Sequence, residues 1–243
     1  MKRSVKRGLK TAALLGLGFA LYEVYRIGGY LSYGAGLQNV AKGFRREYAV
    51  GEGEPVRLVA MGDSTAAGVG VARVEESLPY LVASRLPTRA GVTNLAVSGA
   101  TLRDVVREQL PRFPKEPVDI VLLSISANDA THGTDPAPFE KDLEALLTAL
   151  RERNVERVVL TTTPNFRTTP ALPLLANRLF ERRAATLTVI IERVAARYRN
   201  VSIADLNREG SLAADGYAAD GFHPNAAGYR KWADVLLLSA RGR

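Results

Sequence analysis

Short runs of apolar and β-branched residues alternate with longer amphipathic segments throughout residues 56–240, and this alternation limits the fold more than any other feature of the chain. Runs of the first kind are typical of buried strands, whereas apolar residues that recur every three or four positions predict helices. A chain that alternates strand and helix folds into a parallel sheet with helices on both faces. The run at residues 118–126 (VDIVLLSIS) is apolar over most of its length, as expected for a strand in the middle of such a sheet.

Strands and helices are expected in strict alternation. The strands are predicted at residues 56–61, 92–97, 118–126, 158–162 and 201–206. The helices are predicted at residues 76–86, 101–110, 138–153, 172–198 and 226–240, with a kink or a break in the fourth. The predicted fold is a three-layer α/β/α structure around a central, mostly parallel five-stranded sheet. Ligands bind such sheets outside the carboxyl ends of the strands, where the strand order reverses, so residues just after strands are the candidate site residues.

Positive charge is concentrated at the N-terminus. The net charge is +8, but residues 1–50 contain nine Lys or Arg against two Glu, and the remaining residues contain 24 basic and 23 acidic side chains. Because the main body is balanced in charge and does not interleave basic with aromatic residues, no nucleic-acid partner is expected. The absence of Cys excludes disulfides and thiolate catalysis, and two His cannot build a multi-His metal site within one chain.

The first 25 residues have the layout of a secretory signal or a signal anchor. A basic cluster in the first ten positions precedes an uncharged run at residues 11–22 (TAALLGLGFALY). A helix of that length spans about 18 Å, which is short of a hydrocarbon core of roughly 30 Å. We expect export or anchoring and association with a membrane, with an uncleaved anchor favoured over a cleaved signal. The alternative is an amphipathic helix that packs on the body or lies on a membrane surface.

Three segments are therefore expected along the chain. Residues 1–25 form the signal or anchor, residues 26–54 form a connector that is rich in Gly and Tyr and ends at GEGEP, and residues 55–243 form the folded domain. If the N-terminal segment directs export, the domain faces outward from the membrane or is secreted, which predicts the cell envelope rather than the cytoplasm.

Four segments lie at the ends of predicted strands or at the start of the last helix. They are residues 62–65 (GDST), 97–100 (VSGA), 126–129 (SAND) and 220–224 (DGFHP). Asp220 comes three residues before His223, so a local turn lets the carboxylate hold one ring nitrogen and leaves the other free to act as a base. Ser64 lies at a strand-to-helix turn, where its hydroxyl is exposed beside a helix N-terminus whose dipole favours developing negative charge. Together these segments supply groups that acyl transfer needs.

Each of these residues, taken alone, also has a structural interpretation. Ser64 is a common type of helix N-cap, and Asp220 with His223 can cap the closing helix. Gly99 and Asn128 are frequent turn residues. For any one of them in isolation the structural role is favoured, and only the joint pattern points to chemistry.

The four segments, in this order on an alternating strand–helix chain, resemble the GDSL or SGNH hydrolase superfamily. The matching residues are Ser64 in MGDST, Gly99 in NLAVSGAT, Asn128 in SANDATH, and Asp220 with His223 in DGFHP. The resemblance covers about residues 56–240. It implies the flavodoxin-like SGNH hydrolase fold, with residues 55–243 as the catalytic domain.

The resemblance implies a role for each matched residue. Ser64 would be the nucleophile, His223 the general base and acid, and Asp220 the group that orients the imidazole. The backbone N–H groups of Ser64 and Gly99 and the side-chain amide of Asn128 would form the oxyanion hole. The chemistry agrees, because serine is a poor nucleophile until a base takes its proton, and removing one oxyanion donor costs about 3–4 kcal/mol. This reaction requires no metal and no organic cofactor.

One position departs from the family pattern. The family has Gly two residues before the Asn, where this chain has Ser126, so a reshaped or tighter pocket is expected if close backbone approach is needed there. Asp63 and Asp129 flank the key residues and are expected to hold loops by accepting backbone N–H bonds.

Two further residues compete for roles at the site. His132 is expected to bind substrate or support its loop rather than to act in catalysis, and Asp205, at the end of the fifth strand, is the competitor of Asp220 as the orienting carboxylate. The segment at residues 164–173, after the fourth strand, is a candidate wall of the pocket.

The leading hypothesis is a serine ester hydrolase that forms an acyl-Ser64 intermediate and hydrolyses it with water activated by His223. The expected substrates are short-chain acyl esters, O-acetyl groups on envelope sugars or lipid esters, and the N-terminal segment favours lipid or acetylated-glycan esters. Two alternatives stay open. One is an acyltransferase that passes the acyl group to an alcohol, and the other is a membrane-tethered binding protein on a catalytically silent hydrolase fold.

Overall fold

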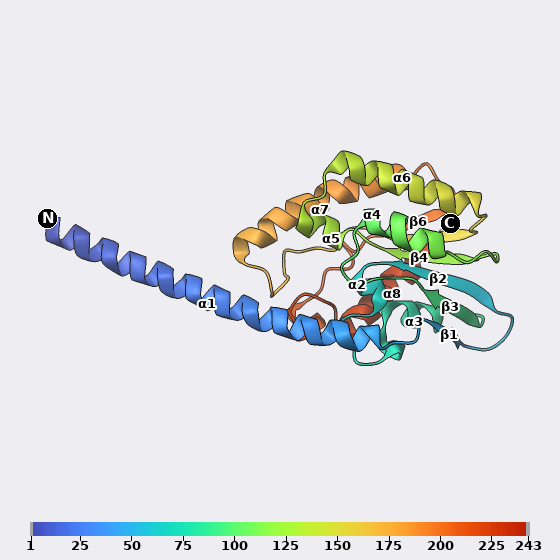
Figure 1. The fold of residues 1–243 in the computed structure, drawn as a ribbon, viewed down its shortest axis with the longest axis horizontal. Coiled ribbons are helices and arrows are strands. Elements are labelled where there is room, and N and C mark those ends of the chain that lie inside the picture. Colours follow the sequence, from blue (N-terminus) through green and yellow to red (C-terminus); the bar gives the residue numbers. More distant parts are fainter. Residues whose placement is uncertain (1, 242–243) are drawn as a thin grey trace.

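The fold is built around one six-stranded sheet, as described for residues 2–241 by a computed structural model (Figure 1). Its strands are β1 (Glu47–Val50), β2 (Val56–Gly62), β3 (Ala90–Asn94), β4 (Ile120–Ser124), β5 (Arg157–Thr161) and β6 (Val201–Ala204). They lie in the order β1-β3-β2-β4-β5-β6, and every pair is parallel except β1 with β3. The predicted mostly parallel sheet is confirmed, with six strands in place of five.

The additional strand, β1, comes from the segment that the sequence predicts to be a connector. It is antiparallel to β3, with Glu47 opposite Thr93, and its side chains alternate between exposed and half-buried. The Tyr48 ring stacks on that of Tyr80, with 5.7 Å between the ring centroids. Four residues at a sheet edge, followed by a Gly-rich turn, are too few to give a recognisable alternation, and the prediction of a connector here is wrong for that reason.

Helices cover both faces of the sheet (Figure 1). One face carries α4 (Leu102–Asp104), α5 (Ala127–His132), α6 (Pro136–Glu152) and α7 (Leu174–Ala195), and the other carries α3 (Leu78–Ala83) and α8 (Ala226–Arg241). Helix α4 continues as a π-helical turn (Val105–Gln109) and a 3-10 turn (Leu110–Arg112), and α7 is one uninterrupted helix. The remaining short helical pieces are α2 (Ser64–Ala67) and the 3-10 turns Val74–Glu76 and Ala214–Gly216. The predicted three-layer α/β/α fold is therefore confirmed.

Two apolar cores, one on each face, hold the layers together. Along β2, Val59 and Met61 belong to the core under α6 and α7, whereas Leu58 and Ala60 belong to the core under α3 and α8. Successive side chains of a strand point to opposite faces, so an uninterrupted apolar run is what a strand covered on both sides requires. Each large side chain that is fully buried contributes roughly 1.5–3 kcal/mol relative to leaving it exposed.

The sheet topology selects one edge as the place for a site. Strand β2 lies between β3 and β4, so the chain moves to one side after β2 and to the other side after β3. The crevice at the carboxyl ends of the strands on either side of such a reversal is where ligands bind in open α/β sheets. Ser64, Gly99 and Asn128 follow β2, β3 and β4 respectively, and so lie at this crevice.

Helix α1 (Lys2–Lys42) replaces most of the predicted connector. Its first half projects away from the body, and its second half lies against it (Figure 1). The half-buried residues Tyr30, Gly34 and Gln38 recur every four positions and the buried Ala41 follows, so one face of the second half packs on the body. The predicted anchor at residues 1–25 falls in the first half.

An anchor that crosses a membrane needs a long apolar helix. Among residues 2–241, no helix combines the length and the apolar character needed to cross a membrane.

Candidate active site

The backbone at the end of β2 is held tightly before the chain turns into α2. Gly62 has a φ of 136°, and a Cβ atom there would lie 1.8 Å from the carbonyl oxygen of Ser124. Only glycine fits such a position. The side-chain amide of Gln109 accepts a hydrogen bond from the Gly62 N–H (2.9 Å) and donates one to the Gly62 carbonyl (2.7 Å). This double contact fixes the backbone two residues before Ser64.

The buried carboxylate of Asp63 caps α2. It accepts hydrogen bonds from the backbone N–H of Thr65 (2.9 Å) and from the Thr65 hydroxyl (2.7 Å). Burial raises the pKa of Asp63 to about 6, although these hydrogen bonds oppose the shift. Because Asp63 supplies the cap, the hydroxyl of Ser64 is not needed for it. The predicted loop-holding role of Asp63 is confirmed.

Asp129 holds a second loop in the same way. Its carboxylate accepts the backbone N–H of Leu102 at 3.0 Å, which ties the start of α4 to α5. Burial raises the pKa of this carboxyl as well. The predicted structural role of Asp129 is therefore confirmed.

Three side chains from two distant parts of the sequence are joined by hydrogen bonds. The Nε2 atom of His223 lies 2.9 Å from the Oγ atom of Ser64, and its Nδ1 atom lies 2.5 Å from Oδ2 of Asp220. Ser64, Asp220 and His223 are all buried. The arrangement gives the imidazole one nitrogen on a carboxylate and the other on a hydroxyl, which is the geometry that activates a serine nucleophile.

The carboxylate of Asp220 is fully engaged. Its Oδ1 atom accepts the backbone N–H groups of Phe222 and His223, both at 3.0 Å, while Oδ2 faces the imidazole. Burial alone would raise the pKa of Asp220, but the hydrogen bond and the charge of His223 outweigh it and lower this pKa below its ordinary value. Asp220 therefore stays ionised, as a group that orients an imidazole and stabilises its protonated form must.

Close backbone packing brings the two ends of this chain of contacts together. Gly70 has a φ of 110°, and a Cβ there would lie 2.1 Å from the carbonyl oxygen of Pro224. The hydroxyl of Tyr229, on α8, donates to the carbonyl oxygen of Val69 at 2.5 Å. The loop after α2 is thus pressed against the loop that carries His223.

A cavity of about 430 Å³ opens beside these groups, within the usual size range of small-molecule sites. Ser64, Gly99, Asn128, Asp220 and His223 all line it. Gly99 has a φ of 86° with open space where a Cβ would lie. Within the part of the chain that the structure describes, no group of three or more acidic or His side chains is placed to hold a metal ion.

The side-chain amide of Asn128 is oriented by a neighbour. Its Nδ2 atom donates one hydrogen to the carbonyl oxygen of Ala100 at 2.9 Å. An amide nitrogen carries two hydrogens, so a second donor is left for a group in the cavity. The structure therefore brings all five sequence-predicted site residues to one cavity.

Residues 60–231 match the GDSL-like lipase/acylhydrolase family. The chain belongs to this family. It is 31% identical over 197 residues to a GDSL-like esterase of Mycobacterium tuberculosis, an alignment that covers 76% of this chain and 62% of the relative. The chain thus spans less than two thirds of that relative's length.

Solved structures show the same fold. The structure of TesA has a TM-score of 0.63 at 21% identity, and the match covers 76% of this chain and 98% of that one. An acetylxylan esterase from Geobacillus stearothermophilus, Axe2, has a TM-score of 0.54 at 21% identity, with 79% and 96% of the two chains covered.

Ser126 adopts a backbone conformation that favours glycine. Its φ is 82°, in the left-handed region that glycine adopts without strain. The side chain is completely buried, and its hydroxyl contacts the carbonyl oxygen of Ile125 and the hydroxyl of Thr163 (2.9 Å). Ser126 does not line the cavity, so its side chain does not reshape the cavity by occupying it.

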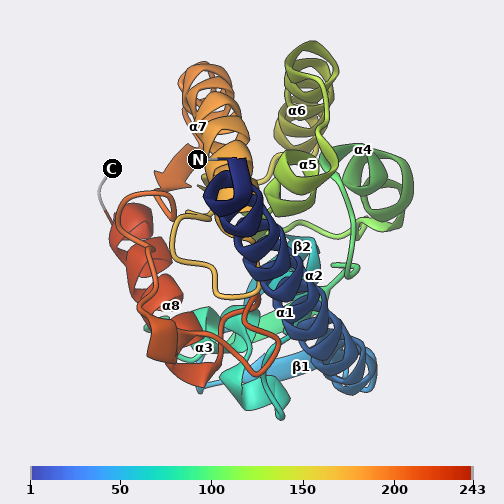
Figure 2. The same cartoon turned by 90° about the vertical axis from the view of Figure 1, so that its left-hand side faces the viewer.

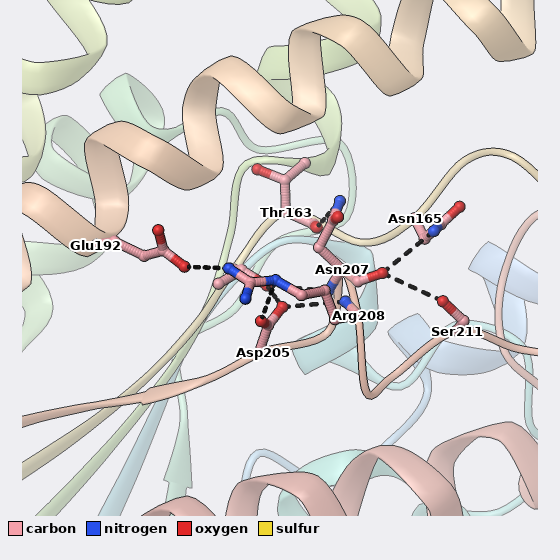
Figure 3. A network of polar contacts seen from close by, with 8 residues as sticks. Thr163, Asn165, Glu192, Asp205, Asn207, Arg208 and Ser211 are labelled. Atoms are coloured by element: carbon pink, nitrogen blue, oxygen red, sulfur yellow. Dashed lines mark hydrogen bonds and ion pairs between the residues drawn. The ribbon is translucent and has the colours of Figure 1, made fainter.

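The competing carboxylate, Asp205, lies in a different network. It pairs with Arg208 at 3.1 Å and accepts the Thr162 hydroxyl at 3.2 Å, and Arg208 also pairs with Glu192 (Figure 3). The structure places Asp220, and not Asp205, on His223. The prediction of Asp220 over Asp205 on grounds of local spacing agrees with this geometry.

Several cavity residues extend the sequence prediction. His132 lines the cavity and is exposed, and Ala171 to Pro173 form part of its wall, as expected for the segment at residues 164–173. Sequence reasoning missed Tyr30, Gly34 and Gln38 of α1, which also line it. Their four-residue spacing was the available signal, but the Gly-rich composition of residues 26–54 favoured a connector.

Proposed function

We propose that this GDSL-like acylhydrolase is a serine esterase that hydrolyses small acyl esters through an acyl-Ser64 intermediate. The observation that carries the proposal is the position of the His223 imidazole, with Nε2 at 2.9 Å from the Ser64 hydroxyl and Nδ1 at 2.5 Å from Asp220. A hydroxyl, an imidazole and a carboxylate in this order form a nucleophile, its base and the group that orients the base.

In the acylation step, the Ser64 hydroxyl attacks the ester carbonyl carbon and its proton passes to Nε2 of His223. The carbonyl π-bond opens to a tetrahedral oxyanion. The C–O bond to the alcohol then breaks, the carbonyl re-forms, and the proton on His223 goes to the departing alcohol. Asp220 stabilises the imidazolium between these transfers without taking the proton itself.

Deacylation repeats the sequence with water. His223 takes a proton from a water molecule, the resulting hydroxide attacks the acyl-Ser64 carbonyl, and the proton returns to the Ser64 oxygen as the carboxylic acid leaves. In both steps we assign the oxyanion to the backbone N–H groups of Ser64 and Gly99 and to the free N–H of Asn128. Donors set in place beforehand are usually the largest single contribution to this chemistry.

The cavity lining favours an ester with an apolar acyl group. Around the polar groups lie Leu172, Pro173, Phe180 and Phe222. The esterase name of the Mycobacterium tuberculosis relative supports the reaction class, and Axe2, an acetylxylan esterase, supports ester substrates on this fold. Location in the cell envelope and acetylated-glycan or lipid substrates stay predictions from residues 1–25.

Hydrolysis of p-nitrophenyl acetate, butyrate and octanoate by the wild type and Ser64→Ala tests the proposal. We expect the substitution to lower kcat by at least about three orders of magnitude. Ser84→Ala is the matched control, because the Ser84 hydroxyl is exposed and donates to the Leu81 carbonyl at the C-terminal end of α3. Equal hydrolysis by wild type and Ser64→Ala would support a binding protein instead. Alcohol acceptors that outcompete water for the acyl group would support an acyltransferase.

A further inference from the structure

The second half of α1 forms one wall of the cavity. Tyr30, Gly34 and Gln38 line it together with Ser64 and His223. Side chains four residues apart lie on the same face of a helix, so these three positions present a continuous stripe to the cavity. Figure 2 shows α1 crossing the end of the molecule at which α2 and α5 lie. These residues precede the region that matches the family, residues 60–231.

The wall is in close contact with the loop that carries the proposed catalytic residues. A Cβ atom at Gly34 would lie 3.7 Å from Oδ2 of Asp220, which is ordinary van der Waals contact. The ring of Tyr30 lies 2.7 Å from where a Cβ of Gly221 would be. Helix α1 therefore rests directly on the loop at residues 220–223, and the absence of a side chain at Gly221 permits the close approach of Tyr30.

The C-terminal end of α1 is fixed to the body. Ala41 is buried, and the Phe44 ring lies 3.1 Å from where a Cβ of Gly68 would be. Just beyond the helix, the Arg46 guanidinium donates to the carbonyl oxygen of Ala96 at 2.8 Å. These contacts hold the wall in place relative to the loops after β2 and β3.

The other side of the cavity is apolar. Phe222 and Phe180 both pack beside Phe166, with ring centroids 6.1 Å away in each pair, and Leu172 and Pro173 complete this side. An acyl chain attached to Ser64 would run between this aromatic side and the stripe on α1. Tyr30, Gly34 and Gln38 of α1 face that chain from the opposite side of the cavity.

We propose that α1 determines acyl-chain specificity, with Gly34 and Tyr30 contacting the chain of the bound ester and limiting its length. The inference rests on the proposed esterase function and deepens it. Gly34 presents no side chain to the cavity, and Tyr30 lines the same cavity one helical turn further along α1. The substrate class assigned to the site is an ester of a short to medium unbranched acyl group.

Gly34→Leu, Gly36→Leu and Tyr30→Ala test the inference. Gly36 is the matched control, because it belongs to the same helix, is exposed, and has nothing within 4 Å of its Cβ position. Leucine is a stronger helix former than glycine, so neither leucine variant is expected to lose α1. For each protein, kcat/KM is measured with p-nitrophenyl acetate, butyrate and octanoate.

We expect Gly34→Leu to lower the octanoate-to-acetate ratio of kcat/KM at least about tenfold, since added side-chain volume displaces the longer chain first. Tyr30→Ala should raise the ratio several-fold, and Gly36→Leu should leave it within about twofold of the wild type. An unchanged ratio in Gly34→Leu, or an equal change in Gly36→Leu, would overturn the inference.

A single-turnover readout separates this inference from the esterase proposal. Methyl- and octylphosphonate p-nitrophenyl esters transfer their phosphonyl group to an activated serine, and intact-mass spectrometry follows the rate. The octyl-to-methyl rate ratio should change in the same direction as the ester ratio for each variant. A wild type that neither hydrolyses esters nor reacts with either phosphonate would contradict both proposals. A reactive wild type with an unchanged ratio in Gly34→Leu would contradict only the role of α1.

Discussion

His223 Nε2 lies 2.9 Å from Ser64 Oγ, although 159 positions separate the two residues along the chain. The contact depends on the close approach of Gly70 to Pro224, which presses the loop after α2 against the loop before α8. Both loops lie at the carboxyl edge of the sheet. Tertiary packing therefore forms the contact between Ser64 and His223. Substitutions of the residues around this pair test its role in catalysis.

Asp220→Asn should lower kcat for p-nitrophenyl butyrate by roughly 10³–10⁴-fold with little change in thermal stability. Asn preserves the shape of Asp220 and can still accept the backbone N–H groups, but it offers an N–H to the imidazole and favours the wrong tautomer. Asp205→Asn is the matched control, because Asp205 pairs with Arg208 away from His223. An equal loss of activity in the two variants would contradict the assignment of Asp220.

Asn128→Ala should lower kcat by roughly 10²–10³-fold and change KM little, because the lost donor acts mainly on the developing oxyanion. Asn200→Ala serves as the control. Its amide also donates to a backbone carbonyl, that of Val155, but it lies at the amino end of β6. Steady-state kinetics on both variants provide the measurement, and a rise in KM at constant kcat would argue for ground-state binding instead.

Ser126→Gly should be more stable than Ser126→Ala by about 1 kcal/mol in urea unfolding. Both variants lose the hydroxyl contact with Thr163, so the comparison isolates the backbone, whose φ of 82° favours glycine. The expected sign is opposite to the usual one, since Ala is more stable than Gly inside a helix. If the Ala variant were the more stable, the left-handed conformation at this position would be wrong.

Asp63→Asn should change how stability depends on pH. The carboxyl of Asp63 ionises near its ordinary pKa in the unfolded chain but only at a pKa of about 6 in the folded one. The folded state therefore loses stability relative to the unfolded state as pH rises between these values, and the loss persists above them. The wild-type free energy of unfolding, relative to the variant, should fall by roughly 2–3 kcal/mol from pH 4 to pH 7. A difference independent of pH would contradict the raised pKa.

Local patterns in the sequence were sufficient for the fold class. The apolar run at residues 118–126 predicts a central strand, and β4 occupies the middle of it. The predicted helices at residues 138–153 and 226–240 correspond closely to α6 and α8. These elements could be predicted because burial of a strand or helix face imposes a period on neighbouring residues. Strand β1 was missed because four residues at an edge carry almost no periodic signal.

The candidate site also has a part that the sequence predicts and a part that it does not. Short motifs in the sequence identify Ser64, Gly99, Asn128, Asp220 and His223 as candidate site residues, because the chemistry requires particular side chains and, at Gly99, a backbone N–H. The contacts of Asp220 with its own loop follow from a three-residue spacing and are local as well.

Only the tertiary structure decided what surrounds these residues. In the structure, most of the predicted connector forms the second half of α1, and this half places Tyr30 and Gly34 beside the loop that carries Asp220. It also showed that Ser126 faces Thr163 and not the cavity. Contacts between segments so far apart leave no local period or spacing in the sequence, since they arise from how the layers pack against one another. The sequence by itself therefore determined which groups can react, and the packing of α1 against the body decided the shape of the space in which a substrate would meet them.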